Sequence, residues 1–294
     1  MSRPMSVKIL SDFDGVWTDQ AFEAENVKLY LIAEAARLAR VAADTAREHF
    51  ERFERIVKSD SGRYGWAPDG RITAYVDEDP FCEANSIAMY LEQTPADPLA
   101  RRYREAVLAG GHESLSKFAD HCFMTATSSF RTQHPPALVP RAAQMFAELV
   151  EAGAEVVVVS NSSSEKIEGW FRETGVGNGL AHALRVRGSA GKFLLGPSDE
   201  HLVLAGRRIL VDRPKYRAIL DEERPDLVIG DVYSLDLALP HVMRREGRCA
   251  ARLALRRHPH TPRWVLDTRA DGAIDLVVEQ LDGLVEAVRG LARR

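Results

Sequence analysis

Two carboxylates one residue apart follow the first apolar run of the chain. The run Val7–Leu10 continues into Ser11, and Asp12 and Asp14 come directly after it. Side chains of an extended strand repeat every second residue, so both carboxylates should face the same side. Two like charges this close raise each other's pKa unless a positive charge lies between them. Because Mg²⁺ prefers carboxylate oxygens, the stretch predicts a metal-assisted acidic site at the carboxyl end of a first strand.

Other polar side chains occupy the ends of further predicted strands. Ser160 and Asn161 follow a run of valines, Asp231 ends a second apolar run, and Lys215 follows a third. In an open α/β sheet the ligand crevice lies outside the carboxyl ends of the strands, so we expect these residues to meet there. Carboxylates for a metal, a hydroxyl at a helix N-terminus and a cation are the groups that a phosphate monoester requires.

The elements that must position these residues fall into two parts. About 110 residues, 20–135, separate the first strand from the next motif, and a structureless connection of that length is uncommon. Ala, Leu, Arg and Glu dominate residues 25–57 at helical spacing without Gly or Pro, which predicts one long helix or two. Further helices are predicted at 82–92, 98–108 and 112–125, with a short strand at 71–76. We therefore expect a mainly helical inserted domain over residues 21–135.

After the Pro135-Pro136 connector, helices and strands alternate. Such alternation predicts a Rossmann-like parallel sheet with helices on both faces, an α/β catalytic core made of residues 1–20 and 136–294. The predicted strands are 155–159, 183–186, 208–211 and 227–229, with 249–255 and 264–267 at sheet edges. The predicted helices are 139–152, a helix opened by residues 160–165, 216–223, 234–245 and 273–289. Segment 180–208 is longer than a simple crossover requires, and the sequence does not explain its length.

Composition restricts the function classes. The 294 residues include 39 Lys and Arg against 43 Asp and Glu, a net charge of −4, which argues against a nucleic-acid binder. Three cysteines far apart, without a C-x-x-C pair, indicate reduced thiols rather than disulfides or a zinc site. The N-terminus lacks a signal-peptide core and no run of 18 apolar residues occurs. We expect a cytoplasmic protein without a membrane partner, and its oligomeric state stays open.

The chain resembles a known family through four motifs. Residues 12–19, Asp-Phe-Asp-Gly-Val-Trp-Thr-Asp, resemble motif I (D-x-D-G-x-x-x-D) of the haloacid dehalogenase-like superfamily. The valine run ending in Ser160 is similar to motif II, and Lys215 stands where the motif III lysine would be. The run from Asp231 to Asp236, preceded by Gly, is similar to motif IV (G-D-x-x-x-x-D). The resemblance covers residues 6–20 and about 137–270, and the insertion between motifs I and II corresponds to the family's first cap type, a mobile lid.

The resemblance implies a role for each carboxylate of the site. Asp12 would be the nucleophile that forms an aspartyl-phosphate. Asp14 would protonate the leaving oxygen and later activate water as a general base. Mg²⁺ would be held by Asp12, the backbone carbonyl of Asp14, and Asp231.

The same resemblance assigns the groups that would bind the phosphoryl oxygens. Ser160, with Asn161 and the neighbouring backbone N–H groups, would hold these oxygens at a helix N-terminus. Lys215 would neutralise charge in the transition state, and Lys192, which follows a glycine, is a rival for that task. Asp236 would orient the lysine or support the metal.

Several functions remain open. The favoured hypothesis is a Mg²⁺-dependent phosphatase for a small phosphorylated metabolite, because a closing lid excludes macromolecular substrates. A phosphotransferase or phosphomutase of the same fold is an alternative, and a dehalogenase is disfavoured because Asp14 is an acid that carbon–halogen cleavage does not need. A signalling domain or a non-catalytic phospho-ligand binder is disfavoured by the insertion. His258 and His260 are interpreted as exposed loop residues without nearby acids.

Overall fold

The computed structural model describes residues 6–292. The chain divides into two compact units, Met1–Asp19 with Pro136–Arg294, and Gln20–Pro135. Each unit has a hydrophobic core of its own. All three cysteines are free thiols, as predicted. Within residues 6–292, no helix combines the length and the apolar character that crossing a bilayer requires.

The first unit is built on a six-stranded sheet. Its strand order is β10-β9-β8-β1-β4-β5, and every pairing is parallel. The strands are β1 Val7–Ser11, β4 Ala154–Val159, β5 Leu184–Arg187, β8 Leu227–Gly230, β9 Arg252–Arg256 and β10 Leu276–Val278. Leu10 of β1 lies between Val157 and Val228. The central strands are apolar on both faces, as strands covered on both sides are, and the predicted α/β fold is confirmed.

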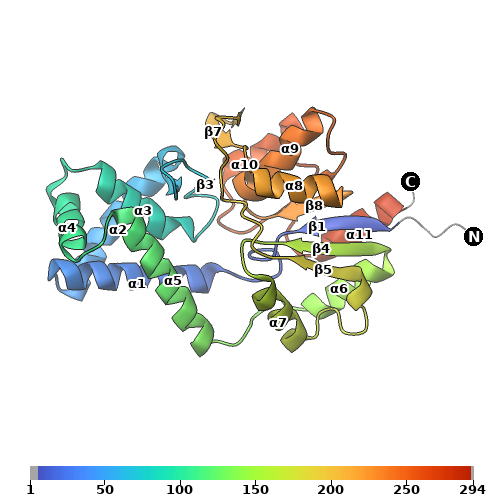
Figure 1. The fold of residues 1–294 in the computed structure, drawn as a ribbon, viewed down its shortest axis with the longest axis horizontal. Helices are drawn as coiled ribbons and strands as arrows, with labels where there is room; N and C mark the ends of the chain where they lie inside the picture. The colour runs from blue at the N-terminus through green and yellow to red at the C-terminus, as the bar shows by residue number, and fades with distance from the viewer. Residues whose placement is uncertain (1–5, 293–294) are drawn as a thin grey trace, which may run out of the picture. The chain divides into compact units, whose positions relative to one another are not determined.

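Helices cover both faces of this sheet. Figure 1 shows α8 (Pro214–Glu223) and α9 (Ala238–Arg245) on one side, and α6 (Ala142–Glu151) and α7 (Ser164–Thr174) on the other. Helix α11 (Asp282–Ala292) packs against α6. On the α6 side, the fully buried side chains of α6, α7 and α11 join those of β1 and β4 in one cluster. Burying each large apolar side chain there contributes roughly 1.5–3 kcal/mol.

The C-terminal part differs from its prediction in three places. The expected edge strand 264–267 is a short helix, α10 (Arg263–Asp267), which begins after Pro262. The expected helix 273–289 divides into strand β10 and helix α11, and β9 lies inside the sheet because β10 covers its edge. Short apolar runs do not reveal by periodicity whether they form a strand or a helix.

Segment 180–208 owes its length to a β-hairpin. Strands β6 (His201–Leu204) and β7 (Arg207–Leu210) pair antiparallel, outside the main sheet. Ala205 and Gly206 form the two-residue turn with φ values of 49° and 76°, as a type I′ hairpin requires. The predicted strand 208–211 therefore exists, but it belongs to this hairpin.

The second unit is mainly helical, as expected. Its helices are α1 Ala21–Ala39, α2 Ala43–Ser59, α3 Cys82–Gln93, α4 Pro98–Ala109 and α5 Leu115–Gln133, and its only described strands are β2 Gly65–Trp66 and β3 Ala74–Tyr75. Helix α1 ends at Arg40, whose φ of 50° is left-handed. In its core Phe50 and Phe53 meet Tyr103 edge to face, with ring centroids 5.0 and 6.1 Å away. Such aromatic pairs stabilise a core beyond the area they bury.

A charge cluster joins α1, α2 and α3. Lys28 Nζ lies 2.9 Å from Glu25, 3.4 Å from Glu54 and 3.6 Å from Glu83. Lys58 Nζ lies 2.5 Å from Glu54 and 3.0 Å from Glu83. Burial lowers the pKa of Lys28, but the three glutamates outweigh it and raise the pKa overall. The cluster thus links three helices through two ammonium groups that are shared among three carboxylates.

The first unit holds together the two points at which the second is inserted. Thr18 and Leu138 form an antiparallel bridge, and the Val139 N–H donates to the Trp17 carbonyl at 2.8 Å. The indole Nε1 of Trp17 donates to Ser11 Oγ at 2.9 Å, and the ring is buried. The α/β unit therefore closes its own backbone across the insertion.

Candidate active site

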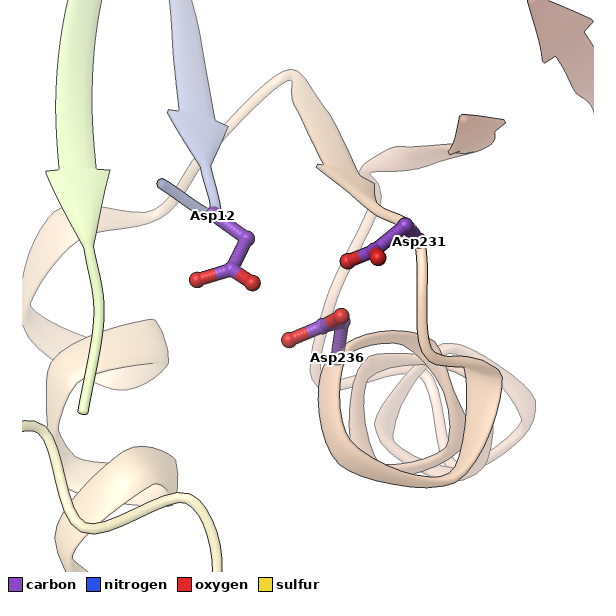
Figure 2. A group of neighbouring side chains, drawn as sticks. All are labelled: Asp12, Asp231 and Asp236. Carbon is purple, nitrogen blue, oxygen red and sulfur yellow. The ribbon is translucent and has the colours of Figure 1, made fainter. Parts of the chain in front are cut away.

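Three carboxylates converge at the carboxyl edge of the sheet. Asp12 follows β1, Asp231 follows the neighbouring strand β8, and Asp236 lies in the turn Tyr233–Leu237 after it. One oxygen from each lies within 4.8 Å of the others. Figure 2 shows the three side chains pointing into the same space. The structure thus brings Asp236 to the same place as Asp12 and Asp231.

Two glycines permit this convergence. A Cβ on Gly15, whose φ is +80°, would lie 1.9 Å from Asp231 Oδ2. A Cβ on Gly230 would lie 2.2 Å from the Asp236 Cβ. Real Cβ atoms do not approach other atoms this closely, so any other residue at either position would displace a carboxylate. Both glycines are needed for space, and Gly15 is needed for its backbone conformation as well.

Lys192 is the cation of this cluster. Its Nζ lies 2.7 Å from Asp12 Oδ1 and 2.7 Å from Asp236 Oδ1, and its side chain is buried. The backbone of the same residue is fixed on both sides: its N–H donates to Asn161 Oδ1 at 2.8 Å, and its carbonyl accepts from Arg213. Burial lowers the pKa of Lys192, but Asp12 and Asp236 outweigh it and raise the pKa above its usual value.

Lys215 was predicted to neutralise charge in the transition state, but the lysine that contacts Asp12 in the structure is its rival, Lys192. Lys215 Nζ donates to the Ser189 carbonyl at 2.6 Å and is exposed. The loop after β5 delivers Lys192 instead, before the hairpin rather than after it. Gly191, with a φ of +61°, was the sequence signal for this turn. Asn161, predicted to bind substrate, holds the backbone of Lys192.

The donor set fits an oxygen-preferring divalent cation. Burial raises the pKa of Asp12 to about 8, Lys192 opposes this rise, and the charges of Asp236 and Asp14 add to it. A cation among these carboxylates would stabilise the ionised form of Asp12. Asp12, Asp231 and Asp236 offer oxygen atoms only, which suits Mg²⁺ better than a soft metal.

Asp14 is held by three donors from the segment after β4. Its Oδ2 accepts from Ser160 Oγ at 3.1 Å and from Ser162 Oγ at 2.9 Å. Its Oδ1 lies 3.2 Å from Lys166 Nζ, which also donates to Ser162 Oγ at 2.9 Å and lies 5.1 Å from the ring centre of Trp170. Ser160 is where the motif places it. Ser162 and Lys166 were missed, although their i, i+4 spacing puts them on one side of a helix start.

His258 was also missed, and its interpretation as a residue without nearby acids is wrong. Its Nε2 lies 2.8 Å from the Gly15 carbonyl and 3.8 Å from Asp231 Oδ2. The ring stacks on His260 with centroids 5.1 Å apart. Burial lowers the pKa of His258, so a neutral ring donates to the carbonyl. The contact arises because β9 lies beside β8, which the linear sequence does not reveal.

No protein-family model and no curated protein sequence matches the chain. Among solved structures, a haloacid dehalogenase-like family hydrolase from Streptococcus pneumoniae aligns over 96% of this chain and 98% of that chain, with a TM-score of 0.47 and 12% identity. A haloacid dehalogenase-like protein of unknown function from Agrobacterium tumefaciens aligns over 98% of this chain and 100% of that chain, with a TM-score of 0.47 and 13% identity. A 2-haloacid dehalogenase from Pseudomonas syringae aligns over 98% of this chain and 99% of that chain, with a TM-score of 0.44 and 17% identity. These TM-scores lie below 0.5 and decide nothing about the reaction. The chain is similar to haloacid dehalogenase-like proteins along nearly its whole length.

Proposed function

We propose that the chain is an enzyme of the haloacid dehalogenase-like superfamily, a Mg²⁺-dependent phosphatase that acts on small phosphate monoesters through an aspartyl-phosphate. One observation carries the proposal. The Asp12 carboxylate contacts the buried ammonium of Lys192. One of its oxygens also lies within 4.8 Å of a carboxylate oxygen of Asp231 and of Asp236. A nucleophile, a fixed cation and oxygen ligands thereby meet at the carboxyl edge of a central strand.

In the first half-reaction, a carboxylate oxygen of Asp12 attacks phosphorus and the bond to the ester oxygen breaks. Asp14 transfers its proton to the leaving oxygen, which departs as an alcohol. Lys192 and Ser160 neutralise and bind the phosphoryl oxygens as charge develops on them. Ser160 Oγ lies within hydrogen-bond distance of Asp14, so the proton donor and the phosphoryl-binding hydroxyl occupy the same side of the site.

In the second half-reaction, Asp14 takes a proton from water and the resulting hydroxide attacks the phosphorus of the aspartyl-phosphate. The acyl phosphate bond breaks, phosphate leaves and the Asp12 carboxylate is restored. Asp14 thus acts first as an acid and then as a base. Its contacts with two hydroxyls and one ammonium hold the carboxyl group in place.

Asp12, Asp231 and the backbone carbonyl of Asp14 would hold the Mg²⁺, and Asp236 would support it through Lys192. When bound, the ion offsets the repulsion between these carboxylates and an anionic substrate. The helical unit, residues 20–135, would limit the substrate to a small metabolite. This expectation comes from the position of the insertion between the first two motifs.

Phosphate release from a panel of phosphorylated metabolites and from p-nitrophenyl phosphate, with and without Mg²⁺, tests the proposal. Asp12→Asn should lower the rate by on the order of 10³-fold or more, because the nucleophile is lost. Asp14→Asn should slow turnover and allow phosphorylated protein to accumulate, as detected by mass spectrometry. Asp226→Asn is a matched control at the amino ends of the strands, where the side chain accepts from the Lys8 N–H.

Full activity of Asp12→Asn would overturn the assignment of the nucleophile. Phosphate appearing on an added alcohol, rather than in solution, would instead identify a phosphotransferase with the same first half-reaction.

A further inference from the structure

Arg256, the last residue of β9, is buried without the hydrogen bonds that a guanidinium needs. The residue is 7% exposed, and its Nε and Nη1 atoms are buried with no hydrogen-bond partner among residues 6–292. Buried polar groups are hydrogen-bonded as a rule, and each unpaired one costs about 1–3 kcal/mol. The fold therefore leaves two charged N–H groups without an acceptor in the described part of the chain, and an anion that reached them would supply the missing hydrogen bonds.

The position of Arg256 relates it to the active site. Gly230 of β8 pairs with Leu255 of β9, so Arg256 lies level with Asp231 at the carboxyl edge of the sheet. Burial lowers the pKa of Arg256, and the charges of Asp231 and Asp19 partly oppose this. Both acids belong to the two aspartate motifs, so the guanidinium adjoins the carboxylate cluster.

Arg256 lies on the opposite side of Asp12 from the groups assigned to the transferred phosphoryl group. Ser160 and Lys192 follow β4 and β5, which continue the sheet on one side of β1, whereas β8 and β9 continue it on the other. Strands lie about 4.8 Å apart, so β9 is roughly 10 Å from β1. A long arginine side chain spans part of this distance. An anionic group at Arg256 and a phosphoryl group at Asp12 would thus occupy two separate points along the carboxyl edge of the sheet.

The guanidinium also has the geometry to recognise an anion. Nε and Nη2 form one fork of donors, and Nη1 and Nη2 form the other, so each fork of Arg256 contains one of the two unpaired groups. Such forks match the two oxygens of a carboxylate, or of a phosphate, in a bidentate arrangement. A lysine would offer a point charge without this match.

We propose that Arg256 binds a second anionic group of the substrate, so that preferred substrates are phosphate monoesters that also carry a carboxylate or a further phosphate. The proposal rests on the phosphatase function proposed above. A different role, as a counterion of Asp231, would affect every substrate equally. A subsite affects only those substrates that carry the second charge.

Two matched pairs of substrates separate these roles. 3-Phosphoglycerate differs from glycerol 3-phosphate by its carboxylate, and fructose 1,6-bisphosphate differs from fructose 1-phosphate by its second phosphate. We expect wild-type kcat/KM to favour, by tenfold or more, the member of one pair that carries the second anionic group. Arg256→Met should abolish that preference, mainly through KM, and Arg256→Lys should keep part of it. The pair that shows the effect identifies the carboxylate or the phosphate as the group bound.

A binding measurement keeps this test independent of catalysis. Asp12→Asn protein in EDTA, titrated calorimetrically with the same four compounds, should bind the member of one pair that carries the second anionic group about tenfold more tightly. Adding Arg256→Met should remove the difference. Arg257→Met is the matched control, because Arg257 is exposed and pairs with Glu279 at 2.9 Å. Thermal melts establish that each variant is folded.

Equal binding within both pairs by the Asp12→Asn protein would overturn the subsite, whatever the outcome of the activity assay. An equal loss on all four compounds in Arg256→Met and Arg256→Lys would overturn it in favour of the counterion role. A selective binding difference without hydrolysis by the wild type would instead retain the anion subsite and reject the phosphatase function.

Discussion

The two units of the molecule both contain a cluster of charged side chains, but they arrange the charges differently. In the helical unit, Lys28 and Lys58 are shared among glutamates of three helices, and opposite charges lie at 2.5–3.6 Å. In the α/β unit, Asp12, Asp231 and Asp236 converge within 4.8 Å, and one ammonium, that of Lys192, contacts two of them.

The difference separates charge used for structure from charge available for chemistry. A cluster that pairs within itself links helices and has little left to offer a ligand. A cluster of three carboxylates with a single ammonium, held at the ends of strands, has a larger excess of negative charge and attracts a cation. The comparison predicts that equivalent substitutions in the two units will have different effects.

The largest expected effect is the loss of kcat when Lys192 is replaced. Lys192→Met should lower kcat by about 10²–10³-fold, because a preorganised cation beside the reacting group is lost. Lys58→Met, in the charge cluster of the helical unit, should lower thermal stability and leave kcat within a few fold. Lys215→Met should change neither. Phosphate-release kinetics and thermal melts measure both quantities, and a large loss of kcat in Lys215→Met would restore the prediction made from sequence.

A second expected effect concerns acid stability of the α/β unit. His241 is buried in α9 with its Nδ1 2.6 Å from the Tyr233 hydroxyl, and burial first, then Arg244, lowers its pKa to about 4. The neutral ring is thus favoured by folding. The free energy of unfolding therefore has its full value, as far as His241 is concerned, above pH 6.5. It falls by about 2–3 kcal/mol as the pH drops from 6.5 through 4, because the unfolded chain binds a proton that the buried ring does not.

Urea unfolding at pH 7.5 and 4.5 measures this loss. Trp66→Phe removes the tryptophan of the helical unit, so that fluorescence reports the α/β unit alone. His241→Gln should flatten the pH dependence between these values. An unchanged slope in that variant would assign the acid sensitivity to other groups.

The smallest expected effect follows from removing the helical unit. A short linker can replace residues 20–135, because the two ends of the insertion are already joined. Thr18 and Leu138 form a β-bridge, and Val139 donates a backbone hydrogen bond to Trp17. The proposed catalytic residues all remain, so hydrolysis of p-nitrophenyl phosphate should persist. Selectivity among metabolites should fall by ~10-fold. Unchanged selectivity would show that the α/β unit itself chooses the substrate.

The sequence predicted the parts of the site that depend on strand ends. Asp12, Asp14, Ser160 and Asp231 each follow an apolar run, and parallel strands bring their carboxyl ends to one edge. The same reasoning cannot place a side chain delivered by a loop, which is why Lys215 was preferred to Lys192.

Two other omissions have related causes. His258 reaches Asp231 because β9 is the neighbour of β8, and strand order is a property of the fold rather than of any local pattern. Lys166 contacts Asp14 because the first turn of α7 is oriented so that its side chain points to the site, and the sequence does not show this orientation. The helix α10 and strand β10 were missed because each is too short to show a period.

The loop that carries Lys192 has a consequence for how the protein can vary. Asn161 holds this loop by one backbone atom and Arg213 by another, and the β6–β7 hairpin emerges only after the lysine. Insertions or deletions at the Ala205-Gly206 turn therefore change the chain length between the lysine and α8 without moving the ammonium. The hairpin is a place where evolution, or an engineer, can add new recognition surface while the reacting groups keep their positions.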